Sequence, residues 1–222
     1  MGCCAVYQDE LPDYDTEGRN LIRHADARTY RDVDALWVHP ETGGVLYVGN
    51  VQIADNRDAL TKLRIFHVVN CAKDLPNFHE HDFPPIVYHR FNIERFRYGG
   101  MMDDEAAVEF VHPMLSFIEE VLGAGGNVLV HCLAGAHRAG TTGVICLMYF
   151  ARLNLRDALP LAQARRPAID PIGAFPLLLA KLDRCFQKDR AVTSEAYGAP
   201  SSAGDSNFLQ HEETSARGDT LC

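Results

Sequence analysis

One short segment constrains the fold of this chain more than any other, and its sequence is His131-Cys132-Leu133-Ala134-Gly135-Ala136-His137-Arg138. An apolar run at 127–130 precedes it, and a run of small and apolar residues at 139–147 follows it. Because Val and Leu without polar alternation are typical of a strand buried on both faces, this order predicts a buried strand, a tight loop and a helix. Such a unit belongs in an α/β fold.

The loop between the predicted strand and helix has the chemistry of an anion site. A helix N-terminus presents unpaired backbone N–H groups and the positive end of the helix dipole to an oxyanion. Small residues at 133–136 let these groups converge, and Gly135 can adopt a backbone conformation that other residues resist. Arg138 adds a planar fork that suits two phosphate oxygens, and the same positive field favours the thiolate of Cys132. The alternative, an inert buried cysteine, leaves Arg138 at this spacing unexplained.

The pattern of His-Cys, five residues and Arg resembles the signature of cysteine-dependent phosphatases. Further segments resemble the dual-specificity branch of that superfamily, namely 46–50, 59–63, 65–72, 117–118 and 165–167 with Phe175, so the resemblance spans roughly residues 44 to 186. It implies a three-layer α/β/α phosphotyrosine-phosphatase-like sandwich with a mostly parallel central sheet. It implies a phosphocysteine intermediate on Cys132, with no metal and no cofactor. It also implies that phosphate is bound by Leu133, Ala134, Gly135, Ala136, His137 and Arg138.

The residue after the arginine departs from the family's pattern, because Ala139 stands where the resemblance predicts Ser or Thr. In the family that hydroxyl donates a hydrogen bond to the cysteine sulfur and helps it leave when the intermediate is hydrolysed. Some members carry alanine there, so we expect a slower second step rather than a dead enzyme. Losing one charge-directed hydrogen bond costs ~1.5–3 kcal/mol, or roughly ten- to a hundredfold in rate. Thr141 and Thr142 are close enough in sequence to substitute, but the sequence does not give their direction.

The general acid is the second departure. The family places an aspartate, which protonates the leaving oxygen, on a loop before the cysteine. Matching the chain from either side of that loop puts Arg95 or Met101 at its position. Asp103 lies just beyond and is the predicted acid, followed by Asp104 and then Glu94. Alternatively, the acidic run that Asp103 begins only complements the dipole of a helix starting there.

Two histidines lie within the signature segment. His131 precedes the cysteine, and its predicted role is to hydrogen-bond and shape the loop rather than to transfer protons. His137 is predicted to contact substrate, with a solvent-facing position as the alternative. None of the histidines has a spacing that indicates a metal site.

Charge and cysteine content restrict the partners and the compartment. The formal net charge of −9 over 222 residues argues against nucleic acid as a partner. The seven cysteines have no spacing typical of zinc or of a disulfide framework, and a nucleophilic thiol needs a reducing compartment such as the cytoplasm. The sequence shows no secretory signal and no transmembrane run, and it leaves the oligomeric state open.

The first residues resemble an acylation signal. Met1 is followed by Gly2, Cys3 and Cys4, which predicts myristate on Gly2 and palmitate on Cys3 or Cys4. One myristoyl chain binds membranes only marginally, so the second acyl group would supply stable membrane association. Val6 stands where Ser or Thr is preferred, and an unmodified start is the alternative.

Three regions are expected along the chain. Residues 1–43 form an N-terminal extension whose Trp37 packs on the domain, 44–188 form the catalytic domain, and 189–222 form a disordered tail. Strands are expected at 45–48, 65–71, 86–91 and 128–131, and helices at 56–63, 103–122, 138–152, 155–166 and 173–187. Pro113 and Pro160 lie inside two of these helices and should kink or shorten them.

The leading hypothesis is a phosphatase that hydrolyses phosphotyrosine and phosphoserine or phosphothreonine on proteins. The loop contains no lysine, which favours protein substrates over phosphoinositides, and phosphoglucan is a further alternative. The rival from another class is a low-turnover phosphate-binding adaptor, because Ala139 and the displaced acid would slow hydrolysis. A rhodanese or arsenate reductase is a third hypothesis, which the segments flanking the loop disfavour.

Overall fold

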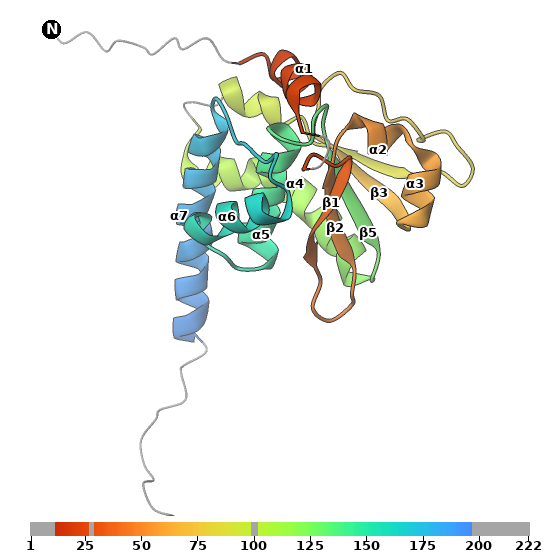
Figure 1. Ribbon diagram of the computed structural model, residues 1–222. Coiled ribbons are helices and arrows are strands. Elements are labelled where there is room, and N and C mark those ends of the chain that lie inside the picture. Colours follow the sequence, from red (N-terminus) through yellow and green to blue (C-terminus); the bar gives the residue numbers. More distant parts are fainter. Residues whose placement is uncertain (1–11, 27–28, 99–101, 197–222) are drawn as a thin grey trace, which may run out of the picture.

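A five-stranded sheet forms the centre of the molecule (Figure 1). The computed structural model describes residues 12–26, 29–98 and 102–196. The strand order is β1-β2-β5-β3-β4, with bounds Val33–Val38, Val45–Gly49, Asn127–His131, Ile65–Asn70 and Val87–Arg90. β1 runs antiparallel to β2, and the other three pairings are parallel. The sheet is therefore mostly parallel, as the sequence predicts.

The central strand β5 is the strand predicted before the cysteine. Residues 128–130 are fully buried, as expected for a strand covered on both faces. Parallel pairing sets Gly49 of β2 and Asn70 of β3 opposite His131. The carboxyl ends of three strands thus meet at the residue before Cys132, and ligands bind beyond such ends in open α/β sheets.

Helices cover both faces of the sheet (Figure 1). On one face, α2 (Val51–Asp55) and α3 (Arg57–Lys62) enclose a small apolar cluster with the sheet. On the other face lie α4 (Asp104–Gly123), α5 (Arg138–Phe150), α6 (Leu155–Arg165) and α7 (Phe175–Ala196), which bury the larger core. Every residue of α5 from 138 to 148 is buried. The three-layer sandwich predicted from the sequence is confirmed.

The two internal prolines do not end their helices. α4 continues through Pro113 and α6 continues through Pro160, so the predicted shortening does not occur. A proline removes one backbone hydrogen bond. In α4 the neighbouring residues Met114 and Leu115 are buried in the core, and their burial offsets that loss.

Part of the predicted N-terminal extension, the strand β1, is built into the sheet of the domain. β1 pairs along β2 at the edge of the sheet, and Leu36 of β1 is buried. Trp37 stacks on Phe150 with ring centroids 5.8 Å apart, which confirms that the tryptophan packs on the domain. The boundary expected at residue 43 therefore does not separate two structural units.

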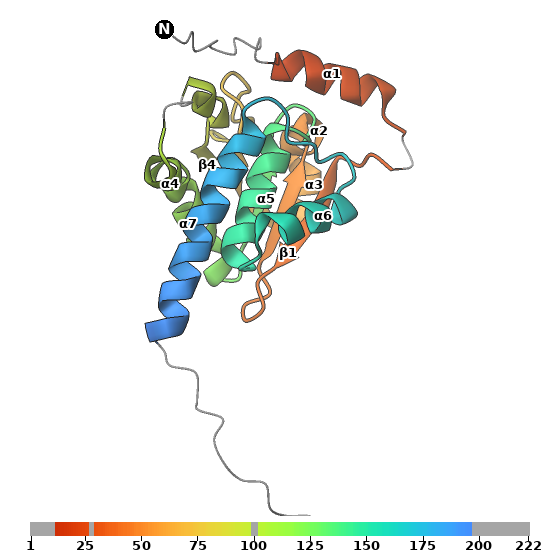
Figure 2. The ribbon, with the colours of Figure 1, turned by 90° about the vertical axis from the view of Figure 1, so that its left-hand side faces the viewer.

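The chain adds a helix at each end of the described region. α1 (Tyr14–His24) lies across the end of the sheet where the parallel strands finish (Figure 2). α7 runs to Ala196, beyond the domain end expected at residue 188. The remainder of the predicted tail, from residue 197, lies outside the described residues.

Candidate active site

The loop after β5, residues 132–138, turns its peptide carbonyls outward, where other elements bind them. The carbonyl of Leu133 accepts from the Val51 N–H at 3.0 Å, and that of Ala134 accepts from the Tyr30 hydroxyl at 2.8 Å. Because the N–H of a planar trans peptide points opposite to its carbonyl, the amides point into the loop. The amides of Leu133, Ala134 and Ala136 have no acceptor in the part of the chain that the structure describes. This Cys132 loop thus offers unpaired donors to an anion.

A buried arginine holds the Cys132 loop from outside. Arg166, which is 1% exposed, donates from Nε to the Gly135 carbonyl at 2.7 Å and from Nη2 to the Ala134 carbonyl at 3.1 Å. Its Nη1 pairs with Asp34 at 2.7 Å. Gly135 has a φ of 64°, and a Cβ there would lie 2.6 Å from the Arg166 side chain. From the sequence, Arg166 is only part of a family-like segment, and nothing there indicates that it is buried under the loop.

Cys132 lies at the start of this loop with its sulfur enclosed. The residue is 2% exposed, and the Gly135 N–H donates to its Sγ at 3.2 Å. Thr141 and Thr142 donate their hydroxyl hydrogens to backbone carbonyls four residues back, at 2.5 and 3.0 Å. Among the described residues, neither hydroxyl therefore replaces the one that Ala139 lacks.

The Arg138 side chain is buried and holds two carboxylates. Its Nη1 donates to Glu94 Oε1 at 2.7 Å, and its Nη2 pairs with Asp15 of α1. Burial by itself would lower the pKa of the guanidinium, but the Cys132 thiolate and the two carboxylates outweigh it and raise that pKa. Nε is buried and has no acceptor among the described residues. Asp15 could not be identified from the sequence, because it lies 123 residues from Arg138 in a polar segment.

The three acidic residues considered from the sequence occupy different places. Glu94 lies on a short 3-10 helix, η1 (Ile93–Tyr98), directly after β4, and it alone of the three contacts Arg138 in the described residues. The Asp103 carboxylate accepts from the Ala106 N–H at 2.8 Å and so caps α4. That contact is the one expected if the acidic run serves the start of a helix. The role of Asp103 as general acid stays a prediction.

Asp104 binds a basic residue of α7 rather than Arg138. Its carboxylate binds Arg184 of α7 through two hydrogen bonds, of 2.7 and 2.6 Å, and Lys181 lies 3.6 Å away. The hydrogen bonds from Arg184 lower the pKa of this carboxyl group. Asp104 therefore ties α4 to α7.

The two histidines of the loop segment are both buried. Burial lowers the pKa of His131 to about 3, so its ring is neutral, and its nitrogens have no partner in the described ranges. The role of His131 in shaping the loop through a hydrogen bond stays a prediction. His137 donates from Nδ1 to the Asp170 carbonyl at 2.7 Å and is 6% exposed, so it does not face solvent. This hydrogen bond ties the loop to the segment around Asp170, and contact of His137 with substrate stays a prediction.

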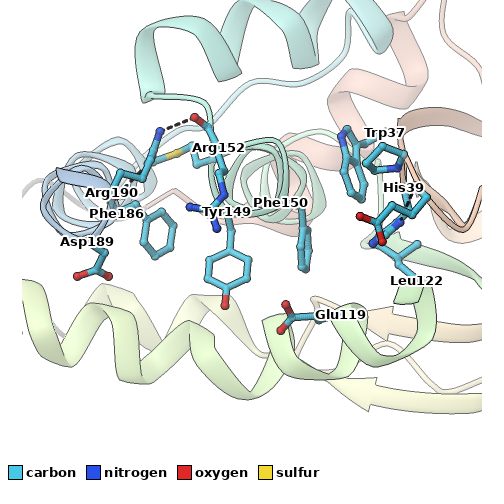
Figure 3. A pocket seen from close by; sticks show the side chains of 13 residues that line it. Trp37, His39, Glu119, Leu122, Tyr149, Phe150, Arg152, Phe186, Asp189 and Arg190 are labelled. Carbon is cyan, nitrogen blue, oxygen red and sulfur yellow. Dashed lines mark hydrogen bonds between the residues drawn. The ribbon is translucent and has the colours of Figure 1, made fainter. Parts of the chain in front are cut away.

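A groove of about 570 Å³ is lined by residues of β1, α4, α5 and α7 (Figure 3). Trp37, Tyr149, Phe150 and Phe186 form aromatic parts of its wall, with Glu119 and Asp189 among its acidic lining residues. None of its lining residues belongs to the loop. The size of a cavity is therefore a poor guide to the chemistry of this chain.

Cys71 and Cys146 are confirmed as core residues, since both are fully buried and burial raises the pKa of both thiols. Gly2, Cys3 and Cys4, predicted to be acylated, lie outside the described residues. Within the described ranges, none of the helices has the length and apolar character needed to cross a bilayer.

Comparisons with known proteins agree with this geometry. The family model "Dual specificity phosphatase, catalytic domain" matches residues 46–184. Dual specificity protein phosphatase 1 of Arabidopsis thaliana is 32% identical over 161 residues, which are 72% of this chain and 75% of the plant protein. Dual specificity protein phosphatase 9 of Homo sapiens is 30% identical over 159 residues, which are 71% of this chain and 40% of the human protein.

A solved structure shares the fold. The crystal structure of human DUSP28 aligns with a TM-score of 0.57 at 21% sequence identity, over 71% of this chain and 96% of that chain. The family match spans well over half of the chain and contains the Cys132 loop. The chain therefore belongs to the dual-specificity phosphatase family of cysteine-dependent protein phosphatases.

Proposed function

We propose that Cys132 is the nucleophile of this phosphatase and that the Cys132 loop with Arg138 binds the phosphate. The observation that carries the proposal is the outward direction of the loop carbonyls, which leaves the amides as donors to one point beside Sγ. Nε of Arg138, which has no acceptor among the described residues, is a further charged donor available to the phosphate. Donors arranged in advance around developing negative charge are the largest single contribution in many enzymes.

The reaction then proceeds in two displacements. The Cys132 thiolate attacks phosphorus, an S–P bond forms, and the P–O bond to the leaving group breaks while that oxygen takes a proton. A water molecule next attacks phosphorus, the S–P bond breaks, and inorganic phosphate leaves with the thiolate restored. Because Ala139 has no hydroxyl to donate to Sγ, we expect the second displacement to be slowed.

The substrates are phosphorylated proteins, as the family implies. We propose that both phosphotyrosine and phosphoserine or phosphothreonine are accepted, since the Cys132 loop is neutral apart from Arg138 and His137 and does not match a highly charged headgroup. A phosphoinositide or a phosphoglucan as the preferred substrate would contradict this part of the proposal.

The first test is hydrolysis of 4-nitrophenyl phosphate, whose activated leaving group barely needs the general acid. The full chain should release nitrophenolate, and Cys132→Ser should abolish the release. Absence of any Cys132-dependent release, with phosphate binding intact, would show a phosphate-binding adaptor instead. A panel of phosphopeptides, phosphoinositides and phosphoglucan, measured at several pH values, then ranks the substrates.

We also propose that myristate on Gly2 and palmitate on Cys3 or Cys4 hold the protein at a membrane. The support is the sequence Met1-Gly2-Cys3-Cys4 alone. Gly2→Ala should move the protein from the membrane fraction to the soluble fraction, and a double change of Cys3 and Cys4 to Ser should weaken its retention. Unchanged membrane recovery of Gly2→Ala would count against the idea.

A further inference from the structure

The helix α1 is seated on the Cys132 loop. Gly18 is buried, and a Cβ built on it would lie 3.4 Å from the side chains of Ala134 and Leu133. One turn earlier, Tyr14 stacks on Phe175 with ring centroids 4.6 Å apart. Figure 2 shows the whole helix spanning this end of the domain. The helix is thus fixed to the loop at one point and to the start of α7 at another.

The same helix places a carboxylate where phosphate binding needs a cation. Asp15 pairs with Nη2 of Arg138 while Glu94 occupies Nη1. A phosphate dianion bound in the loop would lie against this guanidinium, and like charges at such distances repel strongly when they are partly buried. A bound phosphate and both carboxylates therefore compete for the Arg138 guanidinium, and each weakens the binding of the others.

Of the two carboxylates, Asp15 is the one able to leave. The Glu94 side chain is 13% exposed and lies inside the segment that matches the family, between β4 and α4. The Asp15 side chain is 40% exposed and lies before that segment, in the first turn of a helix of which only Tyr14 and Gly18 are buried. Moving α1 uncovers one large core side chain, Tyr14, whereas moving Glu94 would disturb Ile93 and Phe96 of η1, which are both buried in the core.

We propose that α1 is an internal cover of the active site, in which the Asp15 carboxylate takes the place of a substrate phosphate oxygen on Arg138. Substrate binds only when α1 lifts, so the apparent affinity for phosphate is reduced by the fraction of molecules that are open. This inference rests on the proposed role of the Cys132 loop as the phosphate site. Access to that site would then be regulated by a helix that lies outside the segment matching the family.

The test compares Asp15→Asn with Glu17→Gln in the full chain. Glu17 is an exposed residue of the same helix, so its variant is a control for the loss of one negative charge. Asp15→Asn should raise kcat/KM for 4-nitrophenyl phosphate roughly tenfold, the factor expected for a partly buried ion pair that competes with substrate. Glu17→Gln should match the wild type. Equal or lower activity in Asp15→Asn would overturn the proposal.

A second variant lifts the helix without touching its charge. A Cβ at Gly18 would already contact Ala134 and Leu133 at 3.4 Å, so the larger side chain of Gly18→Leu should push α1 away from the loop and raise kcat/KM in the same direction as Asp15→Asn. In the wild type, saturating inorganic phosphate should speed amide exchange in residues 14–24. Undiminished protection of α1 at saturating phosphate would also overturn the cover.

Binding measured without turnover separates this inference from the proposed function. In a Cys132→Ser background, calorimetry with inorganic phosphate should show roughly tenfold tighter binding when Asp15→Asn is added. Tighter binding together with no hydrolysis by any variant would support the cover and reject the phosphatase activity. Hydrolysis that is the same in the wild type, Asp15→Asn and Gly18→Leu would support the phosphatase activity and reject the cover.

Discussion

Glu94 and Asp15 bind the same guanidinium from two regions of the molecule that differ in how firmly they are held. Glu94 comes from η1, inside the segment matched by the family, and its side chain is largely enclosed. Asp15 comes from α1, outside that segment, and two-fifths of its side chain is exposed. The contrast shows that the Glu94 carboxylate can orient Arg138, whereas the Asp15 carboxylate, in a chemically identical contact, blocks Arg138 from binding phosphate. The decisive property is how much packing must be broken to remove the carboxylate.

The largest effect should come from removing the shared partner. Arg138→Lys keeps a positive charge but loses the fork, so kcat/KM for 4-nitrophenyl phosphate should fall on the order of a thousandfold. In this background, adding Asp15→Asn should change kcat/KM by less than about twofold, because the blocking contact is already gone. A tenfold gain from Asp15→Asn despite Arg138→Lys would show that Asp15 acts through something other than the arginine.

Removing the Glu94 carboxylate should lower activity, whereas removing the Asp15 carboxylate should raise it. Glu94→Gln should lower kcat/KM roughly tenfold, because the guanidinium loses a charged hydrogen-bond partner that fixes its orientation. Comparing the loss of kcat/KM on phosphoserine peptides with the loss on 4-nitrophenyl phosphate then shows whether Glu94 positions Arg138 or donates a proton to the leaving group. A proton donor matters more for the poor leaving group, and Asp103→Asn, measured in parallel, tests the acid predicted from the sequence.

A third change separates entry of substrate from hydrolysis of the intermediate. Ala139→Ser should raise kcat roughly ten- to a hundredfold by supplying the missing donor to Sγ, with little change in kcat/KM. Asp15→Asn should act mainly on kcat/KM. If Ala139→Ser alters neither turnover nor the amount of phosphoenzyme at steady state, the second displacement does not limit the rate.

A separate effect, on the free energy of unfolding rather than on activity, is expected in acid. Burial lowers the pKa of His131 from 6.5 to about 3. Between these values the unfolded chain binds a proton that the folded chain does not, so stability falls as pH falls, by about 1.4 kcal/mol per pH unit. Urea unfolding at pH 6.5 and pH 5 should show a loss about 1.6 kcal/mol larger for the wild type than for His131→Asn. Equal losses would mean that His131 is not held neutral.

The parts that could be predicted from the sequence are those whose signals are local. β5, the Cys132 loop and α5 follow one another directly, and a continuous apolar run with small residues after it is enough to recognise them. Gly135 was predictable for the same reason, because its conformation depends on the turn it occupies. The four parallel strands and the long helices followed from similar runs.

The parts that could not be predicted depend on polar contacts between distant segments. Asp15 meets Arg138, and Arg166 meets Asp34, across more than a hundred residues, and such pairs leave no periodic pattern. α1 buries only Tyr14 and Gly18, so its sequence is polar enough to suggest an extension without structure. β1 buries Asp34 beside Leu36 and exposes Val38, so its sequence lacks the alternation of apolar and polar residues that would have indicated a strand.

The burial of Cys132 under a loop covered by α1 also bears on how long the thiol survives. Peroxide oxidises accessible thiolates first to sulfenic acid and then irreversibly. Cys132 is 2% exposed with α1 in place, so under the proposed cover we expect the closed molecule to be screened from oxidants and the open molecule to react with them. Peroxide would therefore inactivate the open molecules first, and the closed molecules would keep a reduced Cys132.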